Sequence, residues 1–294
     1  MLQIFVVGLL MALVATGSAL TQTEAALPTT KAPCATVATV HTRSNSATRY
    51  SWVPGRPVEG ASSGGSVAFI LLIGGGGTLD LDDAGCPRRL KGNILVRTAP
   101  LLQAAGIATA LVDAPSDWSS GEGLAGFRMQ PEHAADLARV IADVRTRSGA
   151  TAVWVMGHSR GSLSAANAAA RLSGAHAPDG VVLVSAMLQG ETSKRKPWVS
   201  QTIFATELKA FKGALLLVGH AADNCERSLP ERLDAAVQGS QAARQQVVRM
   251  VGGPRSTGRA PSLSTCEVHE AHDFVDQDAE FAQGVLRFVG GGRF

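Results

Sequence analysis

From Val67 onward the sequence alternates between short apolar runs and longer stretches with helical periodicity. Val67–Ile73, Ile107–Val112 and Thr151–Met156 are apolar runs, and Gln130–Arg147 is an amphipathic stretch between two of them. A strand with apolar side chains on both faces is buried on both faces, and strands joined through helices run parallel. The sequence therefore predicts an α/β fold with a mostly parallel central sheet and helices on both faces.

The same alternation continues to the end of the chain. We expect the whole of residues 67–294 to form one catalytic domain, preceded by an N-terminal extension with the first short strands at residues 26–66. The further elements expected are helices at Leu90–Ala105, Gly161–Leu172, Gln201–Phe211, Leu229–Val237 and Gln277–Phe288, and strands at Val181–Val184, Ala214–Val218 and Gln246–Val251.

The first 25 residues have the pattern of an export signal. Ile4–Ala15 is apolar throughout, which is too short to span a bilayer, and small residues follow at positions 17–19 and again at Ala25. No Lys or Arg precedes the apolar run, so an uncleaved anchor and a buried helix remain alternatives. We predict a signal peptide over residues 1–25, a secreted or periplasmic protein, and no stable membrane insertion after cleavage.

Four cysteines lie downstream of this segment. Their even number in an exported chain predicts two disulfides, with three possible pairings. No two of them have C-x-x-C spacing, so we expect no structural zinc. The cysteines are Cys34, Cys86, Cys225 and Cys266.

Composition argues against a nucleic-acid partner. The formal net charge is only +3, and apart from residues 194–196 the basic residues are scattered. Aromatic residues make up 5% of the chain, which leaves few platforms on which bases could stack. We therefore expect a small-molecule substrate.

The sequence GHSRG at residues 157–161 is the strongest functional signal. It follows an expected strand and precedes an expected helix rich in alanine, which is the context that a G-x-S-x-G motif requires. The strand-to-helix turn is so tight that Gly157 and Gly161 cannot be replaced by residues with side chains. Ser159 is then held in a strained backbone conformation with its hydroxyl exposed. A serine that only caps a helix is the structural alternative.

With this motif in its context, residues 67–288 resemble the α/β-hydrolase family. The resemblance implies an eight-stranded sheet, a triad in the chain order Ser–Asp/Glu–His, and an oxyanion hole built partly from an earlier loop. Only about 29 residues separate Val184 from Ala214, where the lids of this family insert. We therefore expect an α/β-hydrolase fold with little or no lid.

The family's chain order directs the search for the acid and the base downstream. A serine hydroxyl needs a base to remove its proton, and the base needs a carboxylate to orient it. Asp223 follows the strand that ends at Val218 and is the expected acid, with Glu191 as the alternative. His272 is the expected base, because the sequence His-Asp-Phe just before the last helix resembles the ending of many serine hydrolases of this family; His269 is the alternative.

The positions of the acid and the base bear on the cysteines. If Cys225 is bonded to Cys266, a disulfide joins the acid loop to the base loop, and Cys34 is left to pair with Cys86. Closing a loop of about 40 residues would stabilise the fold by roughly 3–4 kcal/mol in the chain-entropy model.

Four consecutive glycines, residues 74–77, follow the first apolar run. No Lys follows Gly77 as a P-loop requires, and Leu79 and Asp80 stand where a dinucleotide fingerprint would place glycine. The acidic residues at positions 80–83 would repel a phosphate, and their spacing does not fit a calcium loop. We expect neither a cofactor nor a metal.

An oxyanion hole accounts better for these glycines. It needs two backbone N–H groups directed at one oxygen, one from the residue after the nucleophile and one from an earlier loop. We expect the N–H of Arg160 as the first donor and that of Gly76 or Gly77 as the second. The family often has histidine where Gly74 stands, which leaves the choice between the two glycines open.

Together these patterns predict an exported serine hydrolase that acts on carboxylic esters through an acyl-enzyme. A peptidase or amidase with the same triad is the first alternative, and a non-catalytic binding module on the same fold is the second. Trp118 and Trp198 are candidates for the pocket lining.

Overall fold

The computed structural model describes residues 34–56, 66–191, 196–253, 260–267 and 269–294. The predicted signal peptide, residues 1–25, lies outside these ranges, as does residue range 57–65 of the N-terminal extension. No helix in the described ranges is both long enough and apolar enough to cross a membrane.

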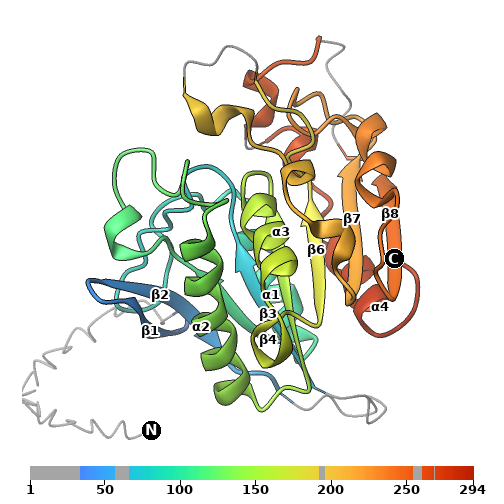
Figure 1. The fold of residues 1–294 in the computed structure, drawn as a ribbon. Helices are drawn as coiled ribbons and strands as arrows, with labels where there is room; N and C mark the ends of the chain where they lie inside the picture. Colours follow the sequence, from blue (N-terminus) through green and yellow to red (C-terminus); the bar gives the residue numbers. More distant parts are fainter. Residues whose placement is uncertain (1–33, 57–65, 192–195, 254–259, 268) are drawn as a thin grey trace, which may run out of the picture. The chain divides into compact units, whose positions relative to one another are not determined.

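An eight-stranded sheet forms the centre of residues 34–294, in the order β1-β2-β4-β3-β5-β6-β7-β8 (Figure 1). β1 and β2 form an antiparallel hairpin, and β2 pairs antiparallel with β4. All the remaining neighbours are parallel. The strands are β1 (Thr36–Arg43), β2 (Ser46–Val53), β3 (Val67–Leu72), β4 (Ala108–Val112), β5 (Ala152–His158), β6 (Gly180–Val184), β7 (Ala214–His220) and β8 (Arg244–Met250).

Helices cover both faces of this sheet (Figure 1). Alternate residues of β3 enter two separate cores: Ile70 packs on the side of α2 and α3, whereas Leu71 packs on the side of α1 and α4. This alternation explains why the parallel strands are apolar throughout. The predicted α/β fold is confirmed. The helices are α1 (Ile94–Ala104), α2 (Pro131–Ser148), α3 (Gly161–Arg171) and α4 (Asp278–Val289).

The prediction of two helices, at residues 201–211 and 229–237, is wrong. Residues 201–211 and 229–237 contain only 3₁₀ turns of three or four residues. Ile203, Leu208 and Phe211 are nevertheless buried in the core beside α3, so the apolar spacing reflects burial by separate turns. Thr206 also bonds its hydroxyl to the carbonyl of Ile203, a local contact that competes with helix formation.

The connection between β6 and β7 was the expected place for any lid. Its described residues, 185–191 and 196–213, form 3₁₀ turns and irregular chain without an inserted helical layer.

The predicted functional loops follow β3, β5, β6 and β7. Because these strands are parallel, their carboxyl ends lie at one edge of the sheet.

Candidate active site

Ser159 occupies a tight turn between β5 and α3. Its φ of 52° is in the left-handed region, which a side-chain-bearing residue rarely adopts. The two flanking glycines are needed for close contact: a Cβ on Gly157 would lie 2.3 Å from the oxygen of Gly161, and a Cβ on Gly161 would lie 2.0 Å from the oxygen of Leu72. The local geometry is that of a nucleophile elbow.

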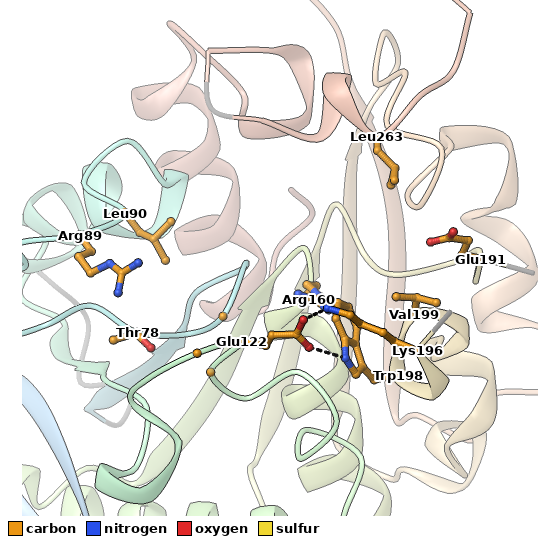
Figure 2. A pocket seen from close by; sticks show the side chains of 13 residues that line it. Thr78, Arg89, Leu90, Glu122, Arg160, Glu191, Lys196, Trp198, Val199 and Leu263 are labelled. Carbon is orange, nitrogen blue, oxygen red and sulfur yellow. Dashed lines mark hydrogen bonds and ion pairs between the residues drawn. The ribbon is translucent and has the colours of Figure 1, made fainter. Parts of the chain in front are cut away.

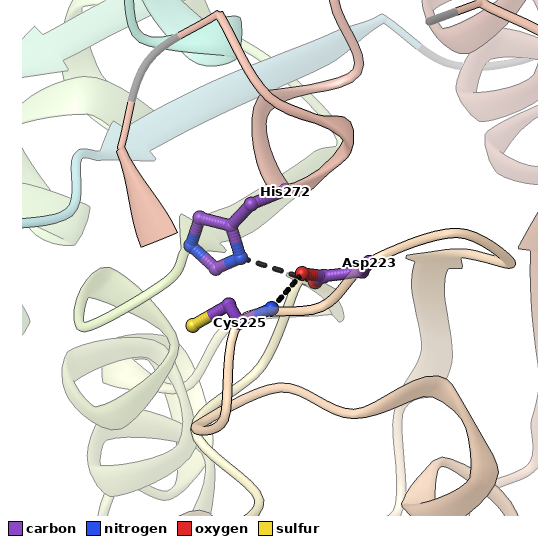
Figure 3. A group of neighbouring side chains, drawn as sticks. All are labelled: Asp223, Cys225 and His272. Carbon is purple, nitrogen blue, oxygen red and sulfur yellow. Dashed lines mark hydrogen bonds and ion pairs between the residues drawn. The ribbon is translucent and has the colours of Figure 1, made fainter. Parts of the chain in front are cut away.

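The predicted acid and base are in contact. His272 Nδ1 lies 3.1 Å from Asp223 Oδ2, and both side chains are 0% exposed. The other carboxylate oxygen of Asp223 accepts a hydrogen bond from the N–H of Cys225 at 2.8 Å (Figure 3). The structure thus brings together two residues that are 49 positions apart in the sequence.

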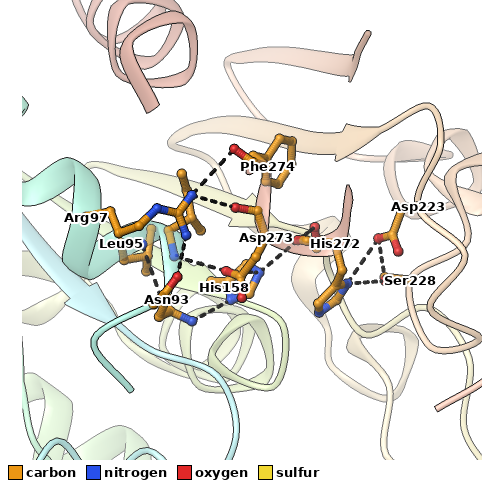
Figure 4. Close-up of polar contacts among 12 residues, drawn as sticks. Asn93, Leu95, Arg97, His158, Asp223, Ser228, His272, Asp273 and Phe274 are labelled. Carbon is orange, nitrogen blue, oxygen red and sulfur yellow. Dashed lines mark hydrogen bonds and ion pairs between the residues drawn. The ribbon is translucent and has the colours of Figure 1, made fainter. Parts of the chain in front are cut away.

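Ser228 is a third member of this group that sequence reasoning missed. Its hydroxyl donates to Asp223 Oδ2 at 2.7 Å and lies 2.9 Å from His272 Nδ1 (Figure 4). A serine five residues after the acid carries no distinctive pattern, so only the folded loop reveals its position. Asp223, Ser228 and His272 are called the acid–base cluster below.

The surroundings of His272 determine the pKa of its ring. Burial lowers the pKa of His272, but the charge and hydrogen bond of Asp223, helped by Asp273, outweigh burial and raise that pKa above its usual value. The opposite ring nitrogen, Nε2, is buried and has no hydrogen-bond partner among the described residues. No hydrogen bond joins it to Ser159 in this structure, and such bonds often tighten only when substrate binds.

The backbone of the base loop is fixed by side chains from two strands. The carbonyl of His272 accepts hydrogen bonds from the Ser185 hydroxyl at 2.8 Å and from His158 Nε2 at 3.1 Å. The carboxylate of Asp273 accepts from the N–H of Ile94, the first residue of α1, at 3.0 Å. The loop is therefore anchored on both sides of the base.

Asn93 determines which nitrogen of His158 carries the proton. Its side-chain oxygen accepts from Leu95 N at 3.1 Å, so its amide nitrogen is the group that donates to His158 Nδ1 at 2.8 Å (Figure 4). His158 Nε2 then carries the hydrogen that it donates to His272. Burial is the main cause of a lowered pKa at His158, which keeps the ring neutral.

The two alternative residues lie outside the acid–base cluster. Glu191 forms an ion pair with Arg227 at 2.8 Å. His269 is exposed, and its φ of 74° belongs to a turn.

Both expected disulfides are present. Cys225 is bonded to Cys266, and Cys34 is bonded to Cys86. Donor atoms of Asp223, Cys225 and His272 lie within 4.8 Å of one another, a grouping that could suggest a metal (Figure 3). Because the Cys225 sulfur is part of a disulfide, it cannot act as a thiolate ligand.

The glycine loop, residues 74–77, packs directly against Ser159. A Cβ on Gly74 would lie 3.0 Å from the Cβ of Ser159. The N–H of Gly77 donates to the oxygen of Gly74 at 3.1 Å and closes a turn. In the described part of the chain, no acceptor binds the N–H groups of Gly75, Gly76 or Arg160.

Arg128 supports the glycine loop through hydrogen bonds, a role that the sequence did not predict. Its guanidinium donates to the carbonyls of Ile73 and Gly75, each at 3.2 Å, and to the hydroxyl of Ser164 at 2.8 Å. Burial, followed by repulsion from Arg160, lowers its pKa to about 9. A fully buried cation thus holds the carbonyl of Gly75 in the loop and that of Ile73 just before it.

The comparison with known families agrees with this geometry. Residues 93–251 match the family model described as serine aminopeptidase, S33. The chain belongs to this family of α/β-hydrolases. No curated protein sequence matches the chain.

Solved structures show the same fold as this S33 family member at low sequence identity. An α/β serine hydrolase homologue from Coxiella burnetii has 16% identity and a TM-score of 0.52, covering 86% of this chain and 96% of its own. An esterase from Pyrococcus furiosus has 12% identity and a TM-score of 0.52, covering 87% and 90%. A propionate-bound esterase from Thermogutta terrifontis has 16% identity and a TM-score of 0.53, covering 88% and 96%.

The S33 family member has a pocket beside Ser159. An inner compartment of about 270 Å³ contains Ser159 and Met187, and it adjoins an outer compartment of about 530 Å³ that extends to Leu90. Trp198 lines both compartments, as predicted (Figure 2). Trp118 does not line either compartment. Its ring stacks on the ring of Phe127, with the two ring centres 4.7 Å apart.

Proposed function

We propose that the chain is an exported serine hydrolase that cleaves carboxylic esters with Ser159 as nucleophile, His272 as base and Asp223 as acid. The observation that carries the proposal is the position of Ser159. Ser159 has a strained backbone conformation and lines the pocket. The same domain also contains the buried pair of His272 and Asp223.

In the proposed reaction, His272 Nε2 takes the proton of the Ser159 hydroxyl while the serine oxygen attacks the acyl carbon. The tetrahedral intermediate collapses, and the leaving alcohol receives that proton. Water then gives a proton to His272 and attacks the acyl-enzyme. As the second tetrahedral intermediate collapses, His272 returns that proton to the Ser159 oxygen and the carboxylic acid is released. Asp223 keeps the ring in the required tautomer and stabilises the imidazolium through both steps.

The oxyanion of the intermediate would be bound by two backbone N–H groups. Arg160 supplies one of them, since its N–H has no internal acceptor. The sequence predicts the N–H of Gly76 or Gly77 as the other donor. Because the N–H of Gly77 already closes a turn, we assign the second donor to Gly76, with the adjacent Gly75 also free to contribute.

Cleavage of esters is favoured over aminopeptidase activity by the charges of the pocket. An aminopeptidase must bind a cationic α-amino group, normally with an available carboxylate. The two acidic residues that line the pocket, Glu122 and Glu191, are both engaged with cations, Lys196 and Arg227. Side-by-side turnover of an ester and of the matching anilide would separate the two activities.

The main test is Ser159→Ala, compared with Ser173→Ala at an exposed position two residues beyond the end of α3. We expect Ser159→Ala to abolish both the hydrolysis of short-chain p-nitrophenyl esters and the labelling by a fluorophosphonate. Ser173→Ala should retain both, and circular dichroism should show that both variants are folded. Residual rates like those of the wild type in Ser159→Ala would refute the proposal, and absence of labelling in the wild type would favour a non-catalytic binding protein.

The proposal of export rests on the predicted signal peptide and on the two disulfides, which persist in oxidising compartments. N-terminal sequencing of the mature protein should show that it begins after residue 19 or 25. An intact Met1 would contradict it.

A further inference from the structure

The side chain of Arg160 is a partly buried cation without an anionic partner among the described residues. Its guanidinium lies 3.8 Å from the centre of the Trp198 ring, and it lines both compartments of the pocket next to Ser159 (Figure 2). Among the described residues no carboxylate forms an ion pair with it, and its Nη2 is buried without a hydrogen-bond partner. Buried polar groups without a partner are uncommon, and a charged one is costly.

The neighbouring charges do not compensate for Arg160. Glu122 is engaged by Lys196 and by the indole N–H of Trp198, at 2.9 Å from the latter (Figure 2). Glu191 is engaged by Arg227, whose side chain is itself largely buried. Each carboxylate that lines the pocket therefore has its own cation, and the pocket keeps a net positive charge, carried by Arg160 next to Ser159 and by Arg89 in the outer compartment.

The titration of Arg160 is consistent with this imbalance. Burial, followed by repulsion from Arg227, lowers the pKa of its guanidinium to about 10. An anion bound in the pocket would offset both effects, since its charge would stabilise the guanidinium and counter the repulsion from Arg227.

We propose that the natural ester substrate carries a carboxylate, which binds the guanidinium of Arg160. This inference rests on the proposed esterase function and names its substrate class. A guanidinium presents planar paired N–H groups that match a carboxylate, and here a cation–π contact with Trp198 holds the guanidinium in the pocket. Since Arg160 and Ser159 line the same compartment, one substrate molecule can carry both the ester and the carboxylate, which then lies in either its acyl part or its alcohol part.

The test compares two esters of equal length in the wild type. Mono-p-nitrophenyl adipate carries a carboxylate in the acyl part, and p-nitrophenyl methyl adipate is its neutral counterpart. A second pair, 4-acetoxybenzoate and 4-acetoxybenzamide, places the carboxylate in the leaving group. We expect the wild type to prefer the charged ester of one pair by at least about tenfold in kcat/KM, as hydrogen bonds to charged groups allow.

Arg160→Gln then identifies the group responsible. The variant keeps the backbone N–H, and any disturbance of the oxyanion hole lowers both esters of a pair alike and cancels in their ratio. We expect the preference for the charged ester to fall to about twofold or less. Arg171→Gln, which removes the same charge from the far end of α3, should keep the wild-type ratio; Arg171 is exposed there.

The outcomes separate this proposal from the proposed function. Hydrolysis of both neutral esters without preference for either charged one would overturn the substrate class while leaving the esterase in place. A preference that persists in Arg160→Gln would also overturn it. Absence of turnover together with absence of fluorophosphonate labelling would overturn the esterase function itself.

Discussion

The two sides of Ser159 are held in different ways. On one side, the glycine loop is positioned through its backbone: its carbonyls accept from Arg128 and from the N–H of Leu124, and a Cβ on Gly123 would lie 2.2 Å from the oxygen of Gly76. On the other side, the acid–base cluster is positioned through side-chain hydrogen bonds and a disulfide.

The difference follows from what each side must present. An oxyanion hole needs free N–H groups at close range, and in the glycine loop a Cβ at Gly76 or Gly77 would press on Glu122 or Leu124, so glycine fits there. An acid–base pair needs two side chains in a fixed orientation, so other side chains and a covalent bond must hold them. Substitutions on the first side should therefore act through steric strain, and those on the second through loss of hydrogen bonds or of the crosslink.

The largest expected effect is on the side of the acid. Asp223→Asn should lower kcat by about 10⁴-fold, because the amide cannot stabilise the imidazolium and favours the wrong tautomer. Asp234→Asn, at an exposed ion pair with Arg249, is the matched control and should keep kcat within about twofold. Ester hydrolysis at saturating substrate measures both, and a loss below about tenfold in Asp223→Asn would remove Asp223 from the triad.

The same variant carries a pH signature. In the wild type the neutral base is required, so kcat/KM should fall as pH falls through the pKa of His272, which lies above the usual 6.5. Without the Asp223 carboxylate, only Asp273 opposes the effect of burial, so the pKa of His272 should fall and the acidic limb should move to lower pH in Asp223→Asn. An unmoved limb would show that another group titrates.

The next largest effect concerns the disulfides. Replacing Cys225 and Cys266 by serine opens a loop with a sequence separation of 41, which costs about 4 kcal/mol in the chain-entropy model, and kcat should fall as the acid and base loops loosen. Replacing Cys34 and Cys86, with a separation of 52, should cost a similar free energy of unfolding while kcat is kept. Urea unfolding and ester hydrolysis measure the two quantities. Equal loss of kcat in both variants would mean that the Cys225–Cys266 bond has no particular effect on the acid–base cluster.

The smallest effect is expected on the glycine side. Gly77→Ala introduces a Cβ at a φ of +80°, 2.7 Å from Leu124 Cδ1 and 2.8 Å from Arg128 Nη2. Gly121→Ala has a similar positive φ of +58° but meets nothing within 4 Å. Backbone strain should lower the free energy of unfolding of both variants by about 1 kcal/mol. In Gly77→Ala the steric contact of the new Cβ should lower it by a further ~1–2 kcal/mol. Equal free energies of unfolding would show that the loop is not tightly packed.

Local patterns account for the part of the fold that the sequence predicts well. The apolar runs predicted the parallel strands, because burial on both faces leaves no polar position to obscure the pattern. The same criterion failed at residues 201–211, where Ile203 and Phe211 are buried by separate 3₁₀ turns. Apolar spacing reports burial, and a helix is only one way to achieve it.

The sequence by itself determined the nucleophile motif, the candidate acid and base, and the even set of cysteines, because each depends on residue type and order along the chain. Only the tertiary structure decided which side chains surround them. Ser228, Arg128 and Arg160 have no local signature, since each contacts a residue that is distant in the sequence: His272, Gly75 and Trp198 respectively. The same holds for the glycine donor: the sequence allowed Gly76 and Gly77 equally, and the turn that occupies the N–H of Gly77 exists only in the folded loop.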